Sequence, residues 1–184
     1  MRQFTSDEIR DFVSMPRFDE QTLLCKDEAW PKISIVTPSY NQGKFLERTI
    51  LSVLNQNYPN LEYIIMDGGS TDGSAGIIRK YERYLAYWRS EKDDGQSAAI
   101  RRGFDMCTGE IYAYLNSDDL YTPGALRTVA RAFREDTASD FVFGNTGFID
   151  ADDAVVGECR FTKFDFATLI YEGTNLHQPG AFWT

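Results

Sequence analysis

Two adjacent carboxylates, Asp118 and Asp119, close a polar stretch that begins at Asn116 and follows a predicted strand. No basic residue lies within this stretch, so the two carboxylates repel each other, and a divalent cation is the usual remedy. Oxygen ligands suit Mg²⁺ or Mn²⁺, which take one or two carboxylates and fill their other positions with water and phosphate oxygens. The same residues are also typical of a solvent-exposed turn, so the stretch alone leaves both interpretations open.

Other polar segments also follow predicted strands. Gly68 and Gly69 would let a ligand approach the backbone closely, and Asp67 could accept hydrogen bonds from a ribose or a base. Residues Asp93–Ser97 lead into the N-terminus of a predicted helix, which suits an anion. Tyr40 offers an aromatic face for a base. Each signal is weak alone, because a tight strand-to-helix turn or a packed tyrosine explains it equally well.

The apolar pattern alternates between strand and helix along most of the chain, and this alternation positions the polar segments. Strands are expected at residues 33–37, 61–66, 86–90, 110–115, 141–143, 147–149 and 155–160. Helices are expected at residues 45–54, 75–84, 99–107 and 123–134. The pattern predicts an α/β fold, a mostly parallel sheet covered by helices on both faces. Ligands bind such sheets at the carboxyl ends of the strands, where the polar segments fall.

Two boundary signals stand out in this pattern. Thr122 and Pro123 read as a helix N-cap followed by a proline at the first helical position. Pro38 is expected to end the first strand. Residues 1–30 are interpreted as an N-terminal arm, with a short capped helix over Asp7–Val13, then irregular chain pinned by Trp30. Residues 31–184 form the domain.

Composition limits the function classes. The 184 residues include 19 Lys and Arg against 28 Asp and Glu, so the net charge is −9 and no nucleic-acid partner is expected. No stretch is apolar for long enough to predict a transmembrane helix, and residues 1–30 lack the apolar core of a secretory signal. The 3 cysteines are far apart. A reduced, cytoplasmic compartment is expected, with peripheral contact at the inner face of the membrane through a local basic patch.

Taken together, the polar segments resemble family 2 of the inverting glycosyltransferases, which have the GT-A fold. The matching segments are Ile33–Asn41, Leu51–Gln56, Ile65–Ser74, Ser90–Gln96 and Thr108–Pro123. The resemblance implies a Rossmann-like three-layer α/β/α domain that binds a nucleotide-diphospho-sugar. It also implies metal-assisted transfer of the sugar, with inversion, to a hydroxyl of a saccharide or lipid-linked acceptor in polysaccharide or glycolipid synthesis.

The resemblance also assigns roles to individual positions. It implies nucleotide binding by the residues Thr37, Pro38, Tyr40, Asp67, Gly68, Gly95, Gln96 and Arg101. A second aspartate often contacts uracil at the position of Gly68, so a UDP donor does not follow here. The metal-binding DxD motif of the family reads Asn116-Ser117-Asp118, which implies Asp118 as the metal ligand and places Asn116 and Ser117 beside the sugar. The single histidine, His177, is implied beside the diphosphate or the metal.

The general base is the missing element. Members of the family carry it in an acidic segment beyond the stretch that matches His177–Thr184, so the domain is expected to be truncated at its C-terminus and the fragment inactive alone. Within the chain, Glu172 and His177 are the candidates. A nucleotide-sugar-binding module without turnover is the alternative function. A dinucleotide-dependent enzyme is disfavoured, because the first strand leads into Pro38–Gly43 rather than into G-x-G-x-x-G.

Overall fold

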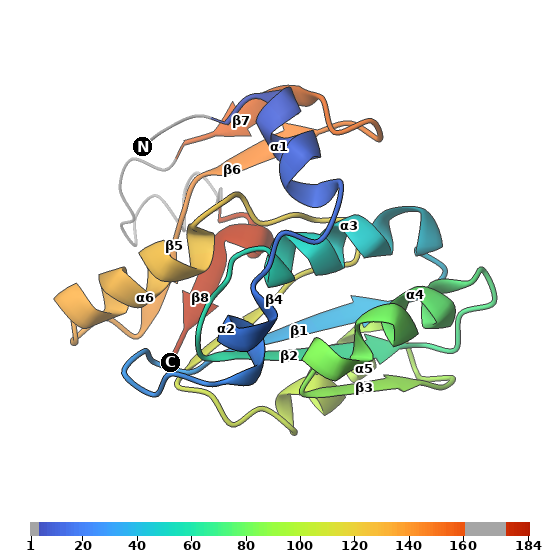
Figure 1. The fold of residues 1–184 in the computed structure, drawn as a ribbon, viewed down its shortest axis with the longest axis horizontal. Coiled ribbons are helices and arrows are strands. Elements are labelled where there is room, and N and C mark those ends of the chain that lie inside the picture. The colour runs from blue at the N-terminus through green and yellow to red at the C-terminus, as the bar shows by residue number, and fades with distance from the viewer. Residues whose placement is uncertain (1–3, 161–175) are drawn as a thin grey trace, which may run out of the picture.

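The computed structural model describes residues 4–160 and 176–184. Its main sheet has six strands in the order β3-β2-β1-β4-β8-β5 (Figure 1). The strands are β1 Ile33–Ser39, β2 Leu61–Asp67, β3 Tyr87–Ser90, β4 Ile111–Tyr114, β5 Phe141–Phe143 and β8 Ala181–Trp183. Strands β1 to β4 pair in parallel, whereas β8 runs antiparallel to both β4 and β5. The mostly parallel α/β sheet predicted from the sequence is therefore confirmed, and β8 is a strand that the prediction missed.

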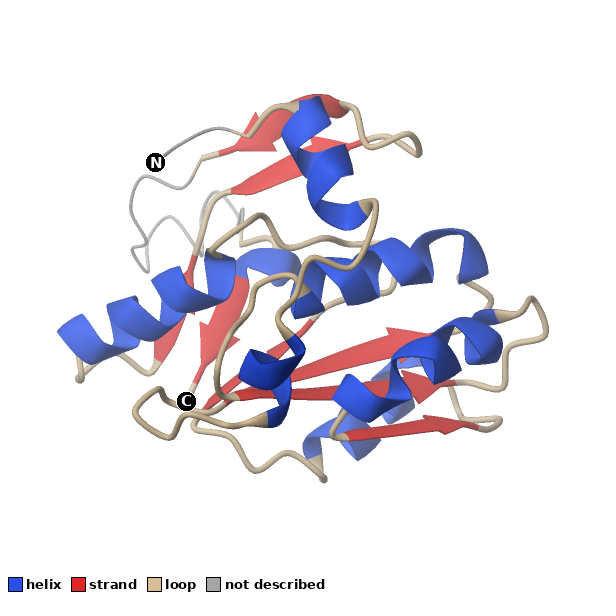
Figure 2. Cartoon of the chain, viewed as in Figure 1, coloured by secondary structure: helices blue, strands red, loops and turns tan. Residues whose placement is uncertain are grey.

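Helices cover both faces of this sheet, as Figure 2 shows. The helices flanking it are α3 Gly43–Leu54, α4 Ser74–Tyr81, α5 Gln96–Phe104 and α6 Ala125–Glu135. Side chains of β1 alternate between the faces: Ile33 and Ile35 join the larger apolar cluster with residues of α3, α4 and α6. Val36 joins a smaller cluster with Ala99 of α5 on the opposite face. The result is a three-layer arrangement with the core on both sides of β1.

Pro38 lies inside β1 instead of ending it, contrary to the prediction. The register of β1 with β2 continues to the pair Ser39 and Asp67, whereas its register with β4 stops at Val36. The carbonyl of Ser39 points toward β2 and accepts a hydrogen bond from the N–H of Gly68. The carbonyl of Val36 points to the opposite edge, toward β4, and accepts from the N–H of Leu115. The nitrogen of Pro38 thus points to the edge of β1 on which β4 lies, but beyond the last residue that pairs with β4. No backbone N–H is needed at this point of the ladder, so proline is tolerated.

Other boundaries also differ from the expectation. Helix α6 begins at Ala125 after Gly124, which has a φ of 80°, so Thr122 and Pro123 precede the helix and do not cap it. The carbonyl of Thr122 instead accepts hydrogen bonds from the N–H of Ala125 and from the side chain of Gln56. Helix α5 begins at Gln96, three residues before the predicted start. A short 3₁₀ helix, Glu82–Tyr84, follows α4.

The arm contains two helices that pack on the domain. Helix α1, Ser6–Val13, has the predicted capping box between Thr5 and Glu8. Helix α2, Glu20–Leu24, was not predicted, and the Asp19 carboxylate caps it. In the arm, the residues Val13 and Leu23 are each 3% exposed and belong to the main core.

A separate two-stranded sheet lies against α1. It consists of β6, Thr146–Ile149, and β7, Val155–Cys159. The N–H of Val155 donates to Oγ of Ser6 at 2.9 Å, and Nε of Arg10 donates to the carbonyl of Asp152 at 2.8 Å. No helix in the described part of the chain is long and apolar enough to cross a membrane.

Candidate functional site

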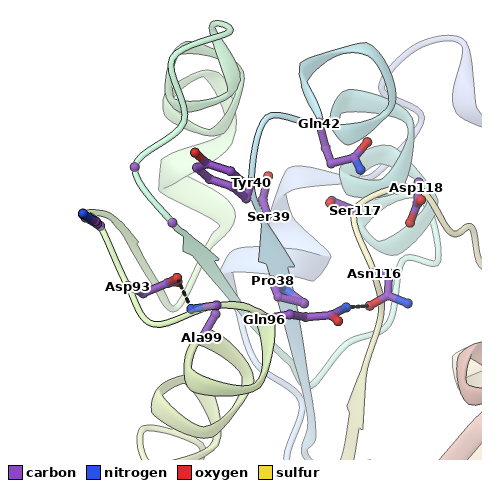
Figure 3. Close-up of a pocket in the computed structure, with 14 residues that line it drawn as sticks. Pro38, Ser39, Tyr40, Gln42, Asp93, Gln96, Ala99, Asn116, Ser117 and Asp118 are labelled. Carbon is purple, nitrogen blue, oxygen red and sulfur yellow. Dashed lines mark hydrogen bonds between the residues drawn. The ribbon is translucent and has the colours of Figure 1, made fainter.

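A pocket of about 590 Å³ opens beside the carboxyl ends of β1, β2 and β4 and the N-terminus of α5 (Figure 3). Its volume falls within the range of about 300–1,000 Å³ typical of small-molecule sites. The residues that line it are Pro38, Ser39, Tyr40, Gln42, Gly68, Gly69, Lys92, Asp93, Gly95, Gln96, Ala99, Asn116, Ser117 and Asp118. The parallel pairing of the strands brings these separate segments to one edge of the sheet.

The pocket brings together most of the residues predicted for the site. Those in its lining are Pro38, Tyr40, Gly68, Gly95, Gln96, Asn116, Ser117 and Asp118. Four predicted residues lie outside the lining: Thr37, Asp67, Arg101 and His177. The assignments to individual positions left out Ser39, Gln42, Lys92 and Ala99, and they also left out Gly69 and Asp93, although both belong to polar segments that the sequence marked. Position alone could have found several of these, because Ser39 directly precedes Tyr40 and Asp93 begins the polar stretch that contains Gly95.

The end of β1 presents an aromatic ring and a hydroxyl to the pocket. Tyr40 is 64% exposed, so its ring is free for contact with a ligand. Ser39 is 5% exposed, and its Oγ has no hydrogen-bond partner among the described residues. The Thr37 hydroxyl, in contrast, is buried and forms a 3.0 Å hydrogen bond with the hydroxyl of Tyr63. An unpaired buried hydroxyl in a pocket wall is costly unless a ligand or water completes it.

Asp67 is committed to the structure of its own loop. It is 2% exposed, and its Oδ2 accepts from the N–H of Ser70 at 2.9 Å and from Oγ of Ser90 at 2.6 Å. Its Oδ1 accepts from Oγ of Ser70 at 2.5 Å. These bonds hold the end of β2 to β3 and shape the turn that carries Gly68. The carboxylate therefore shapes the pocket from behind its lining.

Gly68 separates Tyr40 from Asp93. A Cβ atom at this glycine would lie 3.3 Å from Cδ2 of Tyr40 and 3.3 Å from each carboxylate oxygen of Asp93. The Asp93 carboxylate is oriented by the N–H of Gly95, which donates to its Oδ1 at 2.8 Å. Gly95 has a φ of 102°, a conformation that favours glycine.

On the other side of the pocket, Asn116 is the centre of a hydrogen-bond network. Its Oδ1 accepts from Nε2 of Gln96 at 2.7 Å, which is the dashed line between these two labelled residues in Figure 3. Its Nδ2 donates to Oδ2 of Asp119 at 3.1 Å and to Oε1 of Gln178 at 3.3 Å. Burial raises the pKa of Asp119, and the neighbouring charge of Asp118 raises it further. Asn116 thus holds the loop after β4 to both α5 and the segment that leads into β8.

Asp118 is the pocket residue best suited to hold a metal ion. It is exposed, and its carboxylate lies at the side of the pocket away from Asp93 (Figure 3). No group of three or more His, Cys, Asp or Glu side chains in the described residues forms a ready metal site. A single carboxylate fits Mg²⁺ or Mn²⁺ when a bound diphosphate and water supply the other ligands. The donor set is therefore compatible with a cation that the ligand shares.

His177 packs outside the pocket lining. Its ring contacts Phe148 of β6 edge-on, with 5.3 Å between the ring centroids and an interplanar angle of 86°. Lys92, Asp93 and Asp118 are the charged side chains among the described residues of the lining. Glu172, the other candidate base, lies outside the described residues. The charged lining therefore contains two carboxylates and one lysine, so a cation would have to accompany an anionic ligand in this pocket.

Comparison with protein families gives a match over residues 34–164 to the model described as glycosyl transferase family 2. A β-1,3-glucosyltransferase of Campylobacter jejuni, named for its GalNAc(5)-diNAcBac-PP-undecaprenol substrate, is 30% identical over 119 residues, 62% of this chain and 38% of its own. The chondroitin synthase of Escherichia coli is 34% identical over 124 residues, 65% of this chain and 18% of its own. The chain thus spans less than half the length of these relatives.

A solved structure agrees with the sequence match. The crystal structure of S. aureus TarS 1-349 in complex with UDP-GlcNAc superposes with a TM-score of 0.53 at 26% identity. The superposition covers 61% of this chain and 33% of that one. The three-layer fold described above is therefore shared with a protein whose crystals hold a nucleotide sugar.

Proposed function

The chain belongs to glycosyl transferase family 2, and we propose from this that its pocket binds the nucleotide-diphospho-sugar donor of a glycosyl transfer reaction. One observation carries the proposal: the segments ending β1, β2 and β4 and the segment leading into α5 line a single pocket of adequate volume. The TarS complex supports the class of ligand, since it contains UDP-GlcNAc.

The distribution of side chains around the pocket indicates how the proposed donor would be oriented in it. The exposed ring of Tyr40 and the small Gly68 form one side, which suits a stacked base. Asp118 lies on the other side, which suits the diphosphate and its cation (Figure 3). The unpaired Ser39 hydroxyl between them would bond to the ribose. The N-terminus of α5 at Gln96 adds a positive helix end toward the phosphates.

Asp118 would hold the divalent cation, Mn²⁺ or Mg²⁺. When bound, such a cation supplies positive charge that offsets the negative charge growing on the leaving diphosphate. Ser117 and Asn116 would orient the sugar, with Asn116 held in place by Gln96. Exposed Lys92 adds a second positive group to the pocket wall.

In the proposed reaction, an acceptor hydroxyl attacks the anomeric carbon from the face opposite the diphosphate. The new bond to the acceptor oxygen forms as the bond to the diphosphate oxygen breaks, and a general base takes the hydroxyl proton. Asp118 is assigned to the cation of the donor, so it is not proposed as this base. The acceptor would be a saccharide or a lipid-linked sugar in polysaccharide or glycolipid synthesis, in the cytoplasm or at the inner face of the membrane. The named substrate of the Campylobacter relative and the name of the chondroitin synthase support this acceptor class.

A second candidate is a nucleotide-sugar-binding module without turnover. It is favoured by the lining within the described residues: no histidine lines the pocket, one lining carboxylate, Asp93, accepts a hydrogen bond from Gly95, and the other, Asp118, is the one assigned above to the cation. Incubation with UDP-sugars and GDP-sugars and analysis of their hydrolysis and transfer would separate the two functions. Steady release of nucleoside diphosphate in the presence of a glycan acceptor supports the transferase, whereas binding without release supports the module.

Calorimetry tests the donor site directly. UDP and GDP are titrated into the chain with Mn²⁺ and then with a chelator, and binding should weaken sharply without the metal. Asp118→Asn should abolish this metal dependence, whereas Asp94→Asn, which removes an equal charge outside the lining, should preserve it. Failure of both nucleotides to bind under all conditions would refute the proposed function.

A further inference from the structure

We propose that Asp93 reads the base of the donor and that its carboxylate selects guanine. The inference rests on the proposed function, because it names the base of the donor bound in the same pocket. Its basis is the arrangement of Tyr40, Gly68 and Asp93 at one side of that pocket (Figure 3).

Asp93 occupies the position from which a side chain at residue 68 would reach the base. Both of its carboxylate oxygens lie 3.3 Å from the point where a Cβ of Gly68 would stand. The loop after β3 therefore supplies the carboxylate at this position of the pocket, whereas the turn after β2 supplies only backbone atoms there. The hydrogen bond from the N–H of Gly95 to Oδ1 fixes the orientation of the group before any ligand binds.

No other carboxylate of the described pocket can take this role. Asp67 is buried, and both of its oxygens accept hydrogen bonds from Ser70 and Ser90. Asp118 lies beside Asn116 on the opposite side of the pocket (Figure 3). Asp93 is thus the one acidic group among the lining residues that adjoins the exposed ring of Tyr40.

A carboxylate discriminates between bases because it only accepts hydrogen bonds. Guanine presents two adjacent donors, N1–H and the N2 amino group, which match the two oxygens of a carboxylate. Uracil presents a single N3–H between two carbonyl oxygens, so a carboxylate gains one hydrogen bond and faces the lone pairs of the flanking oxygens. The carboxylate can thus form two charge-assisted hydrogen bonds with guanine. With uracil it forms only one, and the flanking carbonyl oxygens repel it.

Gly68 keeps the space between Tyr40 and Asp93 clear of a side chain. Any side chain at this position would contact the Tyr40 ring and the Asp93 carboxylate at once. With glycine there, a base stacked on the Tyr40 ring, which is 64% exposed, can bring its hydrogen-bonding edge to the Asp93 carboxylate. Discrimination between bases therefore comes from the hydrogen-bonding pattern.

Competition between nucleotides tests the inference. GDP, IDP and UDP are titrated into the chain with saturating Mn²⁺, and their dissociation constants are compared. A bidentate contact discriminates by about fivefold to about 150-fold, so GDP should bind more tightly than UDP by a factor in this range. IDP lacks only the N2 amino group and should fall between them.

Two variants at the loop complete the test. Asp93→Asn keeps an oxygen for the N–H of Gly95 but replaces one acceptor by a donor, so the preference for GDP over IDP should vanish and UDP should gain relative to GDP. Asp94→Asn removes the same charge from the neighbouring exposed position and should keep the GDP preference. Equal or tighter binding of UDP by the unmodified chain would overturn the inference and leave the proposed function intact, whereas absence of binding by all three nucleotides would overturn the function itself.

Discussion

The side-chain amide of Gln96 donates a hydrogen bond to Oδ1 of Asn116 at 2.7 Å, joining the N-terminus of α5 to the loop after β4 across the pocket. The amide hydrogens of Asn116 are also engaged, by Asp119 and Gln178. Asn116, which the resemblance places at the first position of the metal-binding motif, therefore serves as a connector between three segments of the site.

The Asn116→Asp variant should make the stability of the site depend on metal. The new carboxylate would face Oδ2 of Asp119, 3.1 Å from the present amide nitrogen, and would lose the donor that holds Gln178. We expect a lower melting temperature in chelator, recovered in part by Mn²⁺. Thermal unfolding with and without metal measures this, and an unchanged melting temperature in chelator would contradict the role of Asn116 as a connector.

The Ser39→Ala variant should weaken nucleotide binding without weakening the fold. Its hydroxyl is buried and has no partner in the described structure, so its removal costs the folded chain nothing, whereas a bound ligand loses one hydrogen bond. Such a bond is worth about 0.5–1.5 kcal/mol, or about twofold to tenfold in affinity. Thr37→Val is the contrasting variant: it breaks the bond to Tyr63 and should lower stability while leaving affinity nearly unchanged.

Gly103 should tolerate no side chain, because α5 packs closely on β1 at this point. A Cβ there would lie 2.4 Å from Cγ1 of Val36. Gly103→Ala should therefore destabilise the chain by about 1–3 kcal/mol in urea unfolding. Gly76→Ala, in an exposed helical position with no heavy atom within 4 Å of the new Cβ, should stabilise it by about 0.5–1 kcal/mol. Equal effects of the two substitutions would rule out this packing argument.

The ion pair between Arg48 and Asp153 should hold the β6–β7 sheet to α3. The side chain of Asp153 is 7% exposed and that of Arg48 is 25% exposed. Arg48→Met would leave a buried, unpaired carboxylate, which we expect to cost about 2–3 kcal/mol, less than the loss of a partner in a fully buried pair. The double variant with Asp153→Asn should recover much of this loss, since asparagine tolerates the φ of 59° found there. Additive effects in the double-mutant cycle would contradict direct coupling.

Glu62 should contribute to acid sensitivity. Burial alone would raise the pKa of its carboxyl, but hydrogen bonds from Ser34 and Thr108 outweigh burial and lower the pKa below its usual 4.5. A lowered folded-state pKa contributes stability above the unfolded value that is lost as the pH falls through the folded one. Glu62→Gln should therefore flatten the fall in unfolding free energy below about pH 4.5. Parallel pH profiles of the two proteins would exclude this contribution.

The sequence was most informative where a local rule coincides with the tertiary structure. The β-branched run at Ile33 and the capping box at Thr5 depend on neighbours along the chain, and both appear in the structure. The strand β8 and the start of α6 depend on long-range partners: β8 pairs with β4 and β5, and Gln56 binds the carbonyl of Thr122. Local patterns contain no record of such partners.

The same distinction holds for the site. Loops at strand ends could be found from the alternation of elements, and eight of the predicted residues line the pocket. The direction of each side chain could not. Asp67 turns to Ser70 and Ser90, and Asp93 faces Gly68, although both are acidic residues near the carboxyl ends of neighbouring strands.

The burial of the arm has a consequence for where the chain can be cut. The match to the family begins at residue 34, yet Val13 and Leu23 belong to the main core, and the Asn55 side chain donates to the carbonyls of Phe12 and Met15. A protein shortened to the family boundary would expose apolar surface on α3 and free the amide of Asn55. Such a truncated form should be prone to aggregation, and proteases should remove the arm from the intact chain only slowly. Expression of this domain in folded form therefore requires that residues 4–30 be kept together with it as one folding unit.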